Sequence, residues 1–149
     1  MEIVQLNTIE DVYKAYYDVK NTFENLENEV NIDDYLHKIF QFGKVFGVYE
    51  KNADKYFGFS AVYMNDFETK TAYITLIGVS KDYKHKHIGT KLLLFSEEKA
   101  KEFGMEFMRL EVKKNNSVAI SFYKKNNYEY DNKETDTSFF MLKKIIDWN

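Results

Sequence analysis

The sequence predicts a single α/β (α+β) domain in which helices flank a mixed, mostly antiparallel central sheet. The expected order of elements is β-αα-βββ-α-β-α-ββ. Two observations predict this class: three strand-like runs follow one another in mid-chain, and helical and strand-like segments alternate after them. The 149 residues are 44% hydrophobic and 30% charged, a globular balance that suits one domain with one core over residues 1–149.

The N-terminal part predicts a short strand followed by two helices. Residues 3–6 are mostly apolar and are expected to form the first strand. Thr8 with Asp11 resembles a capping box, and apolar residues then recur at helical spacing over Ile9–Phe23. A second helix is expected over Ile32–Phe40, where the apolar residues again share one side.

The middle of the chain predicts an antiparallel meander. The strand-like runs are Val45–Tyr49, Tyr56–Met64 and Thr71–Val79. Short polar segments, Lys51–Asp54 and Asn65–Lys70, separate them and are typical of turns. Because such short connections join antiparallel neighbours, we expect the three strands to pair in order.

The C-terminal part predicts alternating helices and strands. A long helix is expected from about Ile88 to Phe103, and Gly104 follows it as a plausible residue just past the helix end. The remaining expected elements are a strand over Phe107–Val112, a helix over Ser117–Lys125, and strands over Tyr128–Tyr130 and Phe139–Ile145.

Composition excludes several classes of function. The chain has no cysteine, which rules out disulfides, thiolate metal sites and a cysteine nucleophile. Its formal net charge of −3 argues against a general nucleic-acid partner. No apolar run has membrane-spanning length, and the N-terminus lacks the order of a signal peptide. We therefore expect a cytoplasmic protein with no membrane partner, and the absence of proline with abundant Lys, Asn and Ile weakly favours a bacterial source.

One loop has the physical properties of a phosphate cradle. Residues 80–87 join a strand to a helix and carry several lysines and histidines. A helix N-terminus offers free N–H groups and the positive end of a dipole, and Gly89 lets the backbone approach a ligand closely. The alternative is a basic loop that is merely solvated.

This loop resembles motif A of the GCN5-related N-acetyltransferase (GNAT) family. An apolar strand ends at Val79, Lys84 occupies the family's basic position, and Gly89 matches the last glycine of its Gly-x-Gly. His85 and His87 stand where the family commonly has glycine.

The segment Leu110–Tyr128 resembles motif B of the same family. Asn116, Ala119, Ile120 and Tyr123 match it. Asn127-Tyr128 replaces Gly-Phe, and asparagine tolerates left-handed backbone better than other non-glycine residues. Two motifs in the right order cover roughly half the chain, and the resemblance implies the GNAT fold for residues 1–149.

The resemblance implies acetyl-CoA as co-substrate. The backbone of Ile77 and Val79 would pair with the pantetheine arm, and the Val79 N–H would polarise the thioester carbonyl. Backbone N–H groups from His85 to Thr90 would hold the pyrophosphate, and Asn116 would contact the pantetheine. The implied CoA-binding residues are Ile77, Val79, Lys84, His85, Lys86, His87, Ile88, Gly89, Thr90 and Asn116.

The resemblance also implies two catalytic side chains. Tyr123 would protonate the departing thiolate; its alternative is an amphipathic helix residue that packs on the sheet. Glu111 is our candidate for the general base, because ribosomal-protein N-terminal acetyltransferases of the family use a glutamate and a tyrosine at this spacing. An edge glutamate paired with lysine is an equal alternative, and a relayed water is a third.

The acceptor is expected to be a small-molecule or protein amine. Tyr16, Tyr17 and Tyr35 are candidates to line its pocket, and the acidic segment Glu24–Asp34 would attract a cation if it flanks the cleft. No metal is expected, because His85-x-His87 supplies only two ligands. Homodimers are common among similar proteins, so a homodimer is one expectation. The rival functions are an acyl-CoA-binding sensor without turnover and a nucleotide-binding regulatory domain.

Overall fold

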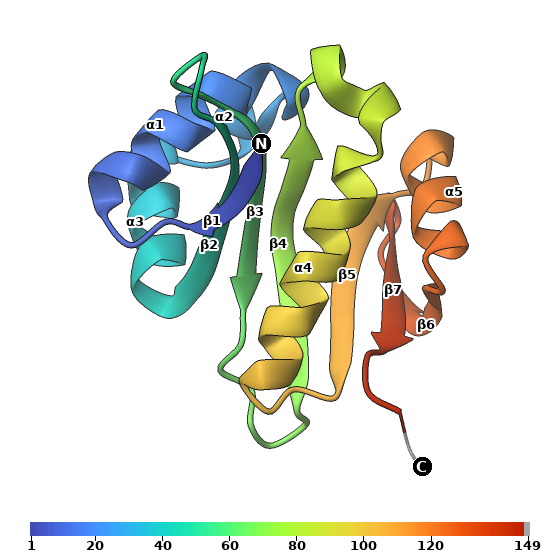
Figure 1. Ribbon diagram of the computed structural model, residues 1–149. Coiled ribbons are helices and arrows are strands. Elements are labelled where there is room, and N and C mark those ends of the chain that lie inside the picture. The colour runs from blue at the N-terminus through green and yellow to red at the C-terminus, as the bar shows by residue number, and fades with distance from the viewer. Residues whose placement is uncertain (148–149) are drawn as a thin grey trace.

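The computed structural model describes residues 1–147, and within this range it describes the backbone alone for residues 84–86 (Figure 1). The described chain forms one seven-stranded sheet with the strand order β1-β2-β3-β4-β5-β7-β6. The strands are β1 (Glu2–Gln5), β2 (Gly43–Glu50), β3 (Lys55–Tyr63), β4 (Thr71–Val79), β5 (Phe107–Lys113), β6 (Glu129–Glu134) and β7 (Ser138–Lys144). Every neighbouring pair is antiparallel except β4 and β5, which are parallel. The expected mixed, mostly antiparallel sheet is therefore confirmed.

The helices follow the expected order, with one addition. They are α1 (Ile9–Val19), α2 (Leu26–Glu29), α3 (Ile32–Phe42), α4 (Ile88–Glu102) and α5 (Ser117–Lys125), with short 3₁₀ turns η1 (Lys20–Thr22) and η2 (Lys81–Lys86). The helix expected over Ile9–Phe23 ends earlier, at Val19, and α2 was not predicted. None of the helices among the described residues is long and apolar enough to cross a membrane.

Two hydrophobic clusters cover the two faces of the sheet. Val45 and Phe46 are neighbours on β2, yet Val45 packs with α1 and α3 whereas Phe46 packs with the α4 and α5 side. This split follows from strand geometry, because successive side chains point to opposite faces. Figure 1 shows α4 lying across one face of the sheet, with α5 beside it.

The ends of the helices show the capping chemistry that the sequence indicates. Thr8 accepts a hydrogen bond of 3.1 Å from the Asp11 N–H at the start of α1. Asn31 makes the equivalent 3.0 Å bond at the start of α3. Gly104 follows α4 with a φ of 92°, and Asn127 follows α5 with a φ of 72°. Both therefore adopt the left-handed backbone that glycine and asparagine tolerate best.

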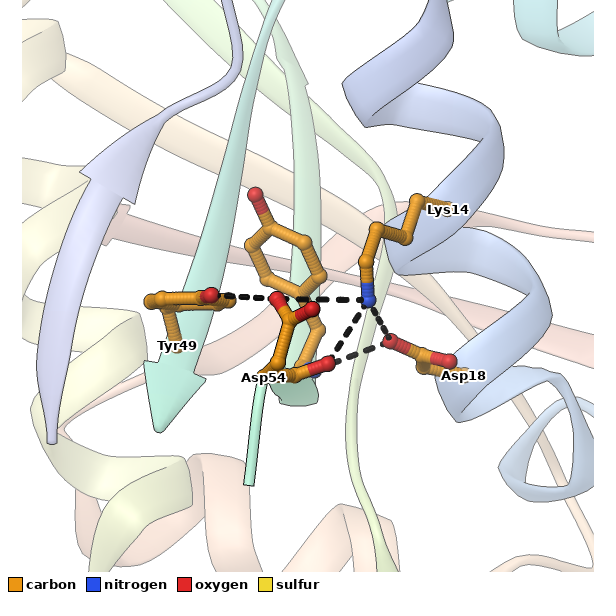
Figure 2. A network of polar contacts seen from close by, with 5 residues as sticks. Lys14, Asp18, Tyr49 and Asp54 are labelled. Atoms are coloured by element: carbon orange, nitrogen blue, oxygen red, sulfur yellow. Dashed lines mark hydrogen bonds and ion pairs between the residues drawn. The ribbon is translucent and has the colours of Figure 1, made fainter. Parts of the chain in front are cut away.

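A polar network fixes α1 against the turn between β2 and β3 (Figure 2). Lys14 Nζ donates to the Asp54 carbonyl oxygen at 2.9 Å and to Asp18 Oδ2 at 3.3 Å. The Tyr49 hydroxyl donates to the Asp54 carboxylate, and the Tyr56 N–H donates to Asp18 Oδ2 at 3.0 Å. These bonds hold the C-terminal half of α1, which leads directly into the η1 turn.

Candidate active site

The cleft begins where β4 and β5 separate. Their parallel pairing runs from Thr71 with Phe107 to Ile74 with Leu110, but both strands continue beyond this last pair. On its other side β4 pairs with β3. Thr75 has no partner in that pairing, so β4 has one extra residue there. Such a bulge increases the local twist of a strand. The two strands diverge towards the end of the sheet at which β4 ends (Figure 1).

A cleft of about 400 Å³ lies in this opening. Its walls come from the end of β4, the first turn of α4 and the cleft-facing side of α5, with one residue from η1. The lining residues are Thr22, Ile77, Gly78, Val79, His87, Gly89, Thr90, Asn116, Val118, Ala119, Phe122 and Tyr123. The cleft thus brings together seven sequence-predicted residues: Ile77, Val79, His87, Gly89, Thr90, Asn116 and Tyr123.

The free edge of β4 presents peptide groups to this cleft. The Ser80 N–H donates to the Phe57 carbonyl oxygen at 2.8 Å. In an antiparallel pair, residues that exchange hydrogen bonds with the partner alternate with residues that do not. Gly78 therefore bonds to β3 as Ser80 does, whereas the N–H and C=O groups of Ile77 and Val79 are directed away from β3. Past Ile74 these groups have no β5 partner.

The N-terminus of α4 opens into the cleft without a side-chain cap. His87 precedes the helix with a φ of 58° and makes no capping hydrogen bond, and the first turn contains no acidic residue. By contrast, α1, α3 and α5 each have a capping side chain. The uncapped N–H groups and the helix dipole at Gly89 and Thr90 therefore favour an anion.

The remaining predicted loop residues divide into two groups. The side chain of Ile88 is buried in the core, so only its backbone is available to a ligand. The side chains of Lys84, His85 and Lys86 lie outside what the structure describes. Their roles towards the pyrophosphate stay predictions.

Tyr123 lies on α5 and lines the cleft. Its ring packs against Phe122 and Tyr128, with centroids 5.4 Å and 5.7 Å away. Among the described residues its hydroxyl has no hydrogen-bond partner. Burial raises the pKa of Tyr123 to about 12. The side chain is therefore a neutral hydrogen-bond donor at physiological pH, and it is both a packing residue and a cleft residue.

Asn116 also has two structural roles. Its Oδ1 accepts a hydrogen bond of 3.1 Å from the Ala119 N–H and so caps α5. The side chain lines the cleft as well. Since Oδ1 is used by the cap, the Nδ2 hydrogens are the part of the amide that a ligand would meet.

The comparisons with known proteins agree with this architecture. Residues 6–128 match the model of the acetyltransferase (GNAT) family. The chain belongs to this family. It is 43% identical to a spermidine N(1)-acetyltransferase of Thermoplasma acidophilum over 63 residues, which are 42% of this chain and only 38% of that enzyme.

Two solved structures share the fold of this GNAT protein over nearly the whole chain. The PaiA N-acetyltransferase of Thermoplasma acidophilum, solved in complex with coenzyme A, is 22% identical with a TM-score of 0.73, covering 97% of this chain and 99% of that chain. The ribosomal-protein-S18-alanine N-acetyltransferase of Escherichia coli is 18% identical with a TM-score of 0.80, covering 99% of this chain and 96% of that chain.

Glu111 of this GNAT protein does not line the cleft. It is exposed on β5, on the sheet face opposite to the buried Leu110 and Val112. The charge of Glu111 acts on Tyr73 of the neighbouring strand β4. Burial raises the pKa of Tyr73, and the charge of Glu111 raises it further. The role of Glu111 as a base therefore stays a prediction.

The tyrosines that were expected to line an acceptor pocket lie in different surroundings. Tyr16 is fully buried in the core between α1 and the sheet, and Tyr17 is 49% exposed. Tyr35 reaches the β4 bulge, where its hydroxyl lies 2.9 Å from Thr75 Oγ1. Burial raises the pKa of Tyr35 to about 12, although the hydrogen bond with Thr75 lowers it in part. Only Tyr35 of the three adjoins the divergent end of β4.

The acidic segment Glu24–Asp34 is mostly exposed and partly neutralised. Glu27 pairs with Lys20 at 3.4 Å, and Asp33 accepts a hydrogen bond of 2.7 Å from the Tyr13 hydroxyl. None of its residues lines the cleft. Among the described residues there is also no cluster of three side chains suited to a metal ion.

The cleft residues that the sequence interpretation missed are Thr22, Gly78, Val118, Ala119 and Phe122. Thr22 was assigned to a continuous helix, which concealed that the chain turns onto β4 at this point. Phe122 lies next to Tyr123 in the motif B segment, and this position could have identified it as a cleft residue. Gly78 is the last residue but one of β4, and nothing in the sequence alone distinguishes it from an ordinary strand residue.

Proposed function

We propose that this protein is an N-acetyltransferase that transfers an acetyl group from acetyl-CoA to a primary amine by direct attack, with both substrates bound together. The observation that carries the proposal is the uncapped N-terminus of α4 beside the free edge of β4 in one cleft. Such a helix end suits phosphates, and peptide groups without a strand partner suit an amide-containing arm. Coenzyme A contains both.

The chain's residues have distinct roles in binding. The N–H groups at the start of α4, including those of Gly89 and Thr90, hold the pyrophosphate. The peptide groups of Ile77 and Val79 hold the pantetheine arm, and Asn116 donates to it from Nδ2. Acetyl-CoA supplies an acetyl group that is activated as a thioester. The Val79 N–H donates to the thioester oxygen, where negative charge develops as the amine attacks.

Proton movements complete the reaction. A new N–C bond forms while the C–S bond breaks, so the sulfur needs a proton and the nitrogen must lose one. Tyr123 donates the proton to the departing sulfur, as its burial keeps it neutral. At neutral pH only about one aliphatic amine in a thousand is deprotonated, so a base must accept the proton from the acceptor. Glu111, through water, is our candidate.

The proposed class of acceptor is based on a similar protein, and not on the residues that line the cleft. A spermidine acetyltransferase is 43% identical over part of the chain, which supports a linear polyamine as the first acceptor to test. The exposed carboxylates of Glu24–Asp34 are compatible with a cationic acceptor, but they form no defined site.

The test is a direct assay with labelled acetyl-CoA. The protein is incubated with spermidine, an alanine-initiated peptide, a lysine-containing peptide and an aminoglycoside, and the products are identified by mass spectrometry. Transfer of label to at least one amine supports the proposal. Binding of CoA without transfer to any amine would instead identify an acyl-CoA sensor. Competition by ATP but not by CoA would indicate a nucleotide-binding domain.

A further inference from the structure

The η1 turn is in direct contact with the part of β4 that faces the cleft. Thr22 Oγ1 donates a hydrogen bond of 3.1 Å to the Val79 carbonyl oxygen. Among the described residues that line the cleft, Thr22 is the one contributed by the N-terminal helical segment. This bond therefore joins two walls of the cleft that are far apart in the sequence.

The fit between this turn and β4 leaves no room for a side chain at Gly78. A Cβ atom there would lie 2.6 Å from Phe23 Cε1 and 2.8 Å from Thr22 Cγ2. Phe23 is held in turn by a stacked contact with Tyr16 and an edge-on contact with Phe59, at centroid distances of 6.4 Å and 6.2 Å. Both of these partners are fully buried. The turn is therefore anchored in the core, and its hydroxyl has a fixed position.

The bond from Thr22 adds a second restraint to the one that β3 supplies at this point. The peptide groups of Val79 are directed away from β3, and β5 no longer pairs with this part of β4. The Ser80 N–H belongs to the same peptide plane as the Val79 carbonyl and donates to the Phe57 carbonyl oxygen at 2.8 Å, so β3 holds this plane from one side. The Thr22 hydroxyl holds the same plane from the opposite side, and through the backbone dihedrals of Val79 it adds to what fixes the direction of the Val79 N–H. A donor that is already oriented needs no reorganisation when charge develops next to it.

We propose that Thr22 is a positioning residue that holds Val79 ready to polarise the acetyl thioester. This inference rests on the proposed function, in which the Val79 N–H meets the thioester oxygen. Thr22 acts through the backbone of β4 and touches no reacting atom. The role belongs to the hydroxyl group, so a serine, which lacks only the methyl group, serves equally well for the hydrogen bond.

The test compares Thr22→Val, which removes the hydroxyl at nearly constant volume, with Thr22→Ser, which keeps it. Isotope-edited infrared spectra of bound acetyl-CoA, labelled at the thioester carbonyl, report polarisation without requiring turnover. We expect the parent and Thr22→Ser to lower the carbonyl frequency relative to free acetyl-CoA, and Thr22→Val to lower it less. Turnover of the amine should fall about ten- to a hundred-fold in Thr22→Val alone. Affinity for CoA, which has no thioester, and the melting temperature should stay near the parent values.

Gly78→Ala provides a second variant that disturbs the hydrogen bond between Thr22 and Val79, in this case by a change in β4. Its Cβ must displace the η1 turn, so we expect the same loss of carbonyl polarisation as in Thr22→Val. An unchanged frequency and turnover in Thr22→Val would overturn the role of Thr22 and leave the proposed function intact. Equal losses of CoA affinity and stability in Thr22→Val and Thr22→Ser would also overturn it, because they indicate a merely structural residue.

The two proposals can fail separately. If the parent polarises acetyl-CoA, Thr22→Val does not, and no amine is acetylated, then the positioning role stands and the enzymatic function is wrong. If the parent does not bind acetyl-CoA at all, both proposals are overturned.

Discussion

Tyr123 and Tyr128 meet edge to face, with their ring centroids 5.7 Å apart, so a cleft residue rests on a fully buried one. The Tyr128 hydroxyl donates a hydrogen bond of 2.8 Å to Glu97 Oε2 on α4. Lys143 Nζ donates to the other carboxylate oxygen, Oε1, at 2.7 Å. The ring of Tyr123 is therefore supported by a buried ion pair that takes no part in the proposed chemistry.

Replacing Tyr123 by phenylalanine tests the proposed acid. The ring contacts remain, but the proton donor is lost, so turnover should fall roughly ten- to a thousand-fold while CoA affinity stays near the parent value. Because the pKa of Tyr123 is raised to about 12, the parent should keep this proton donor up to about pH 11. Steady-state rates and calorimetric titration with CoA provide the measurements. If Tyr123→Phe and the parent have equal turnover, Tyr123 is a packing residue and not the proton donor.

Substitutions at Gly89 distinguish the effect of an added side chain from the effect of an added negative charge in the phosphate cradle. A Cβ at Gly89 would lie 3.7 Å from Phe122 and 3.8 Å from Val79, which is ordinary contact. Gly89→Ala should therefore fold as the parent does and serve as the matched control. Gly89→Glu adds bulk and a negative charge beside the pyrophosphate, so it should weaken CoA binding strongly. If Gly89→Glu binds CoA as tightly as Gly89→Ala, the cradle is elsewhere.

Replacing Glu111 by glutamine tests the proposed base. If Glu111 accepts the amine proton, Glu111→Gln should lower turnover and change the pH–rate profile, without a change in CoA affinity. Glu68→Gln is a suitable control, because Glu68 is an exposed carboxylate in the turn between β3 and β4. An unchanged profile would assign proton removal to water alone.

Removing Lys143 tests the buried pair beneath the cleft. The Glu97 and Lys143 side chains are only 7% and 14% exposed, so Lys143→Met leaves a buried carboxylate without its cation. We expect the free energy of unfolding to fall by about 3–5 kcal/mol in urea titrations. The double variant Glu97→Gln/Lys143→Met removes the charge but keeps an acceptor for Tyr128, and it should recover part of this loss. Equal stability of Lys143→Met and the parent would contradict this account.

Two partly buried tyrosines predict how stability depends on alkaline pH. The pKa values of Tyr35 and Tyr123 are raised from 10.0 to about 12 by burial. Between these values the folded state holds more protons than the unfolded state, so stability falls as pH rises. The stability is fully present below pH 10 and decreases by up to about 2–3 kcal/mol per group towards pH 12. Denaturant titrations at pH 9 and 11 should show this decrease, and the Tyr35→Phe variant should show a smaller one.

Periodicity predicted those parts of the fold in which local pattern and tertiary contacts agree. The bounds of β4 and α5 match the expected ranges Thr71–Val79 and Ser117–Lys125. The single turn of α2 was too short to produce a helical pattern, and α1 ended before its apolar spacing did. The η1 turn begins where α1 ends and packs against Gly78, a contact between distant segments that no local pattern encodes.

The candidate site was predicted where a motif fixes backbone geometry. Asn127 adopts the left-handed conformation that its replacement of glycine indicates, and His87 adopts it as well. The face of Glu111 also follows from the sequence, because Leu110 and Val112 on either side of it are apolar. The separation of β4 from β5 could not be predicted in this way, since it depends on where pairing stops rather than on which residues form strands.

The early end of the β4–β5 pairing leaves the ligand-free protein with an incomplete sheet. An unpaired strand edge is a place where another chain can add, and it is a common start of aggregation. An extended ligand arm lying along Ile77–Val79 would serve as the missing strand and would stabilise the folded state in proportion to its occupancy. Co-substrate supply would then govern the lifetime of the folded protein as well as its rate of turnover.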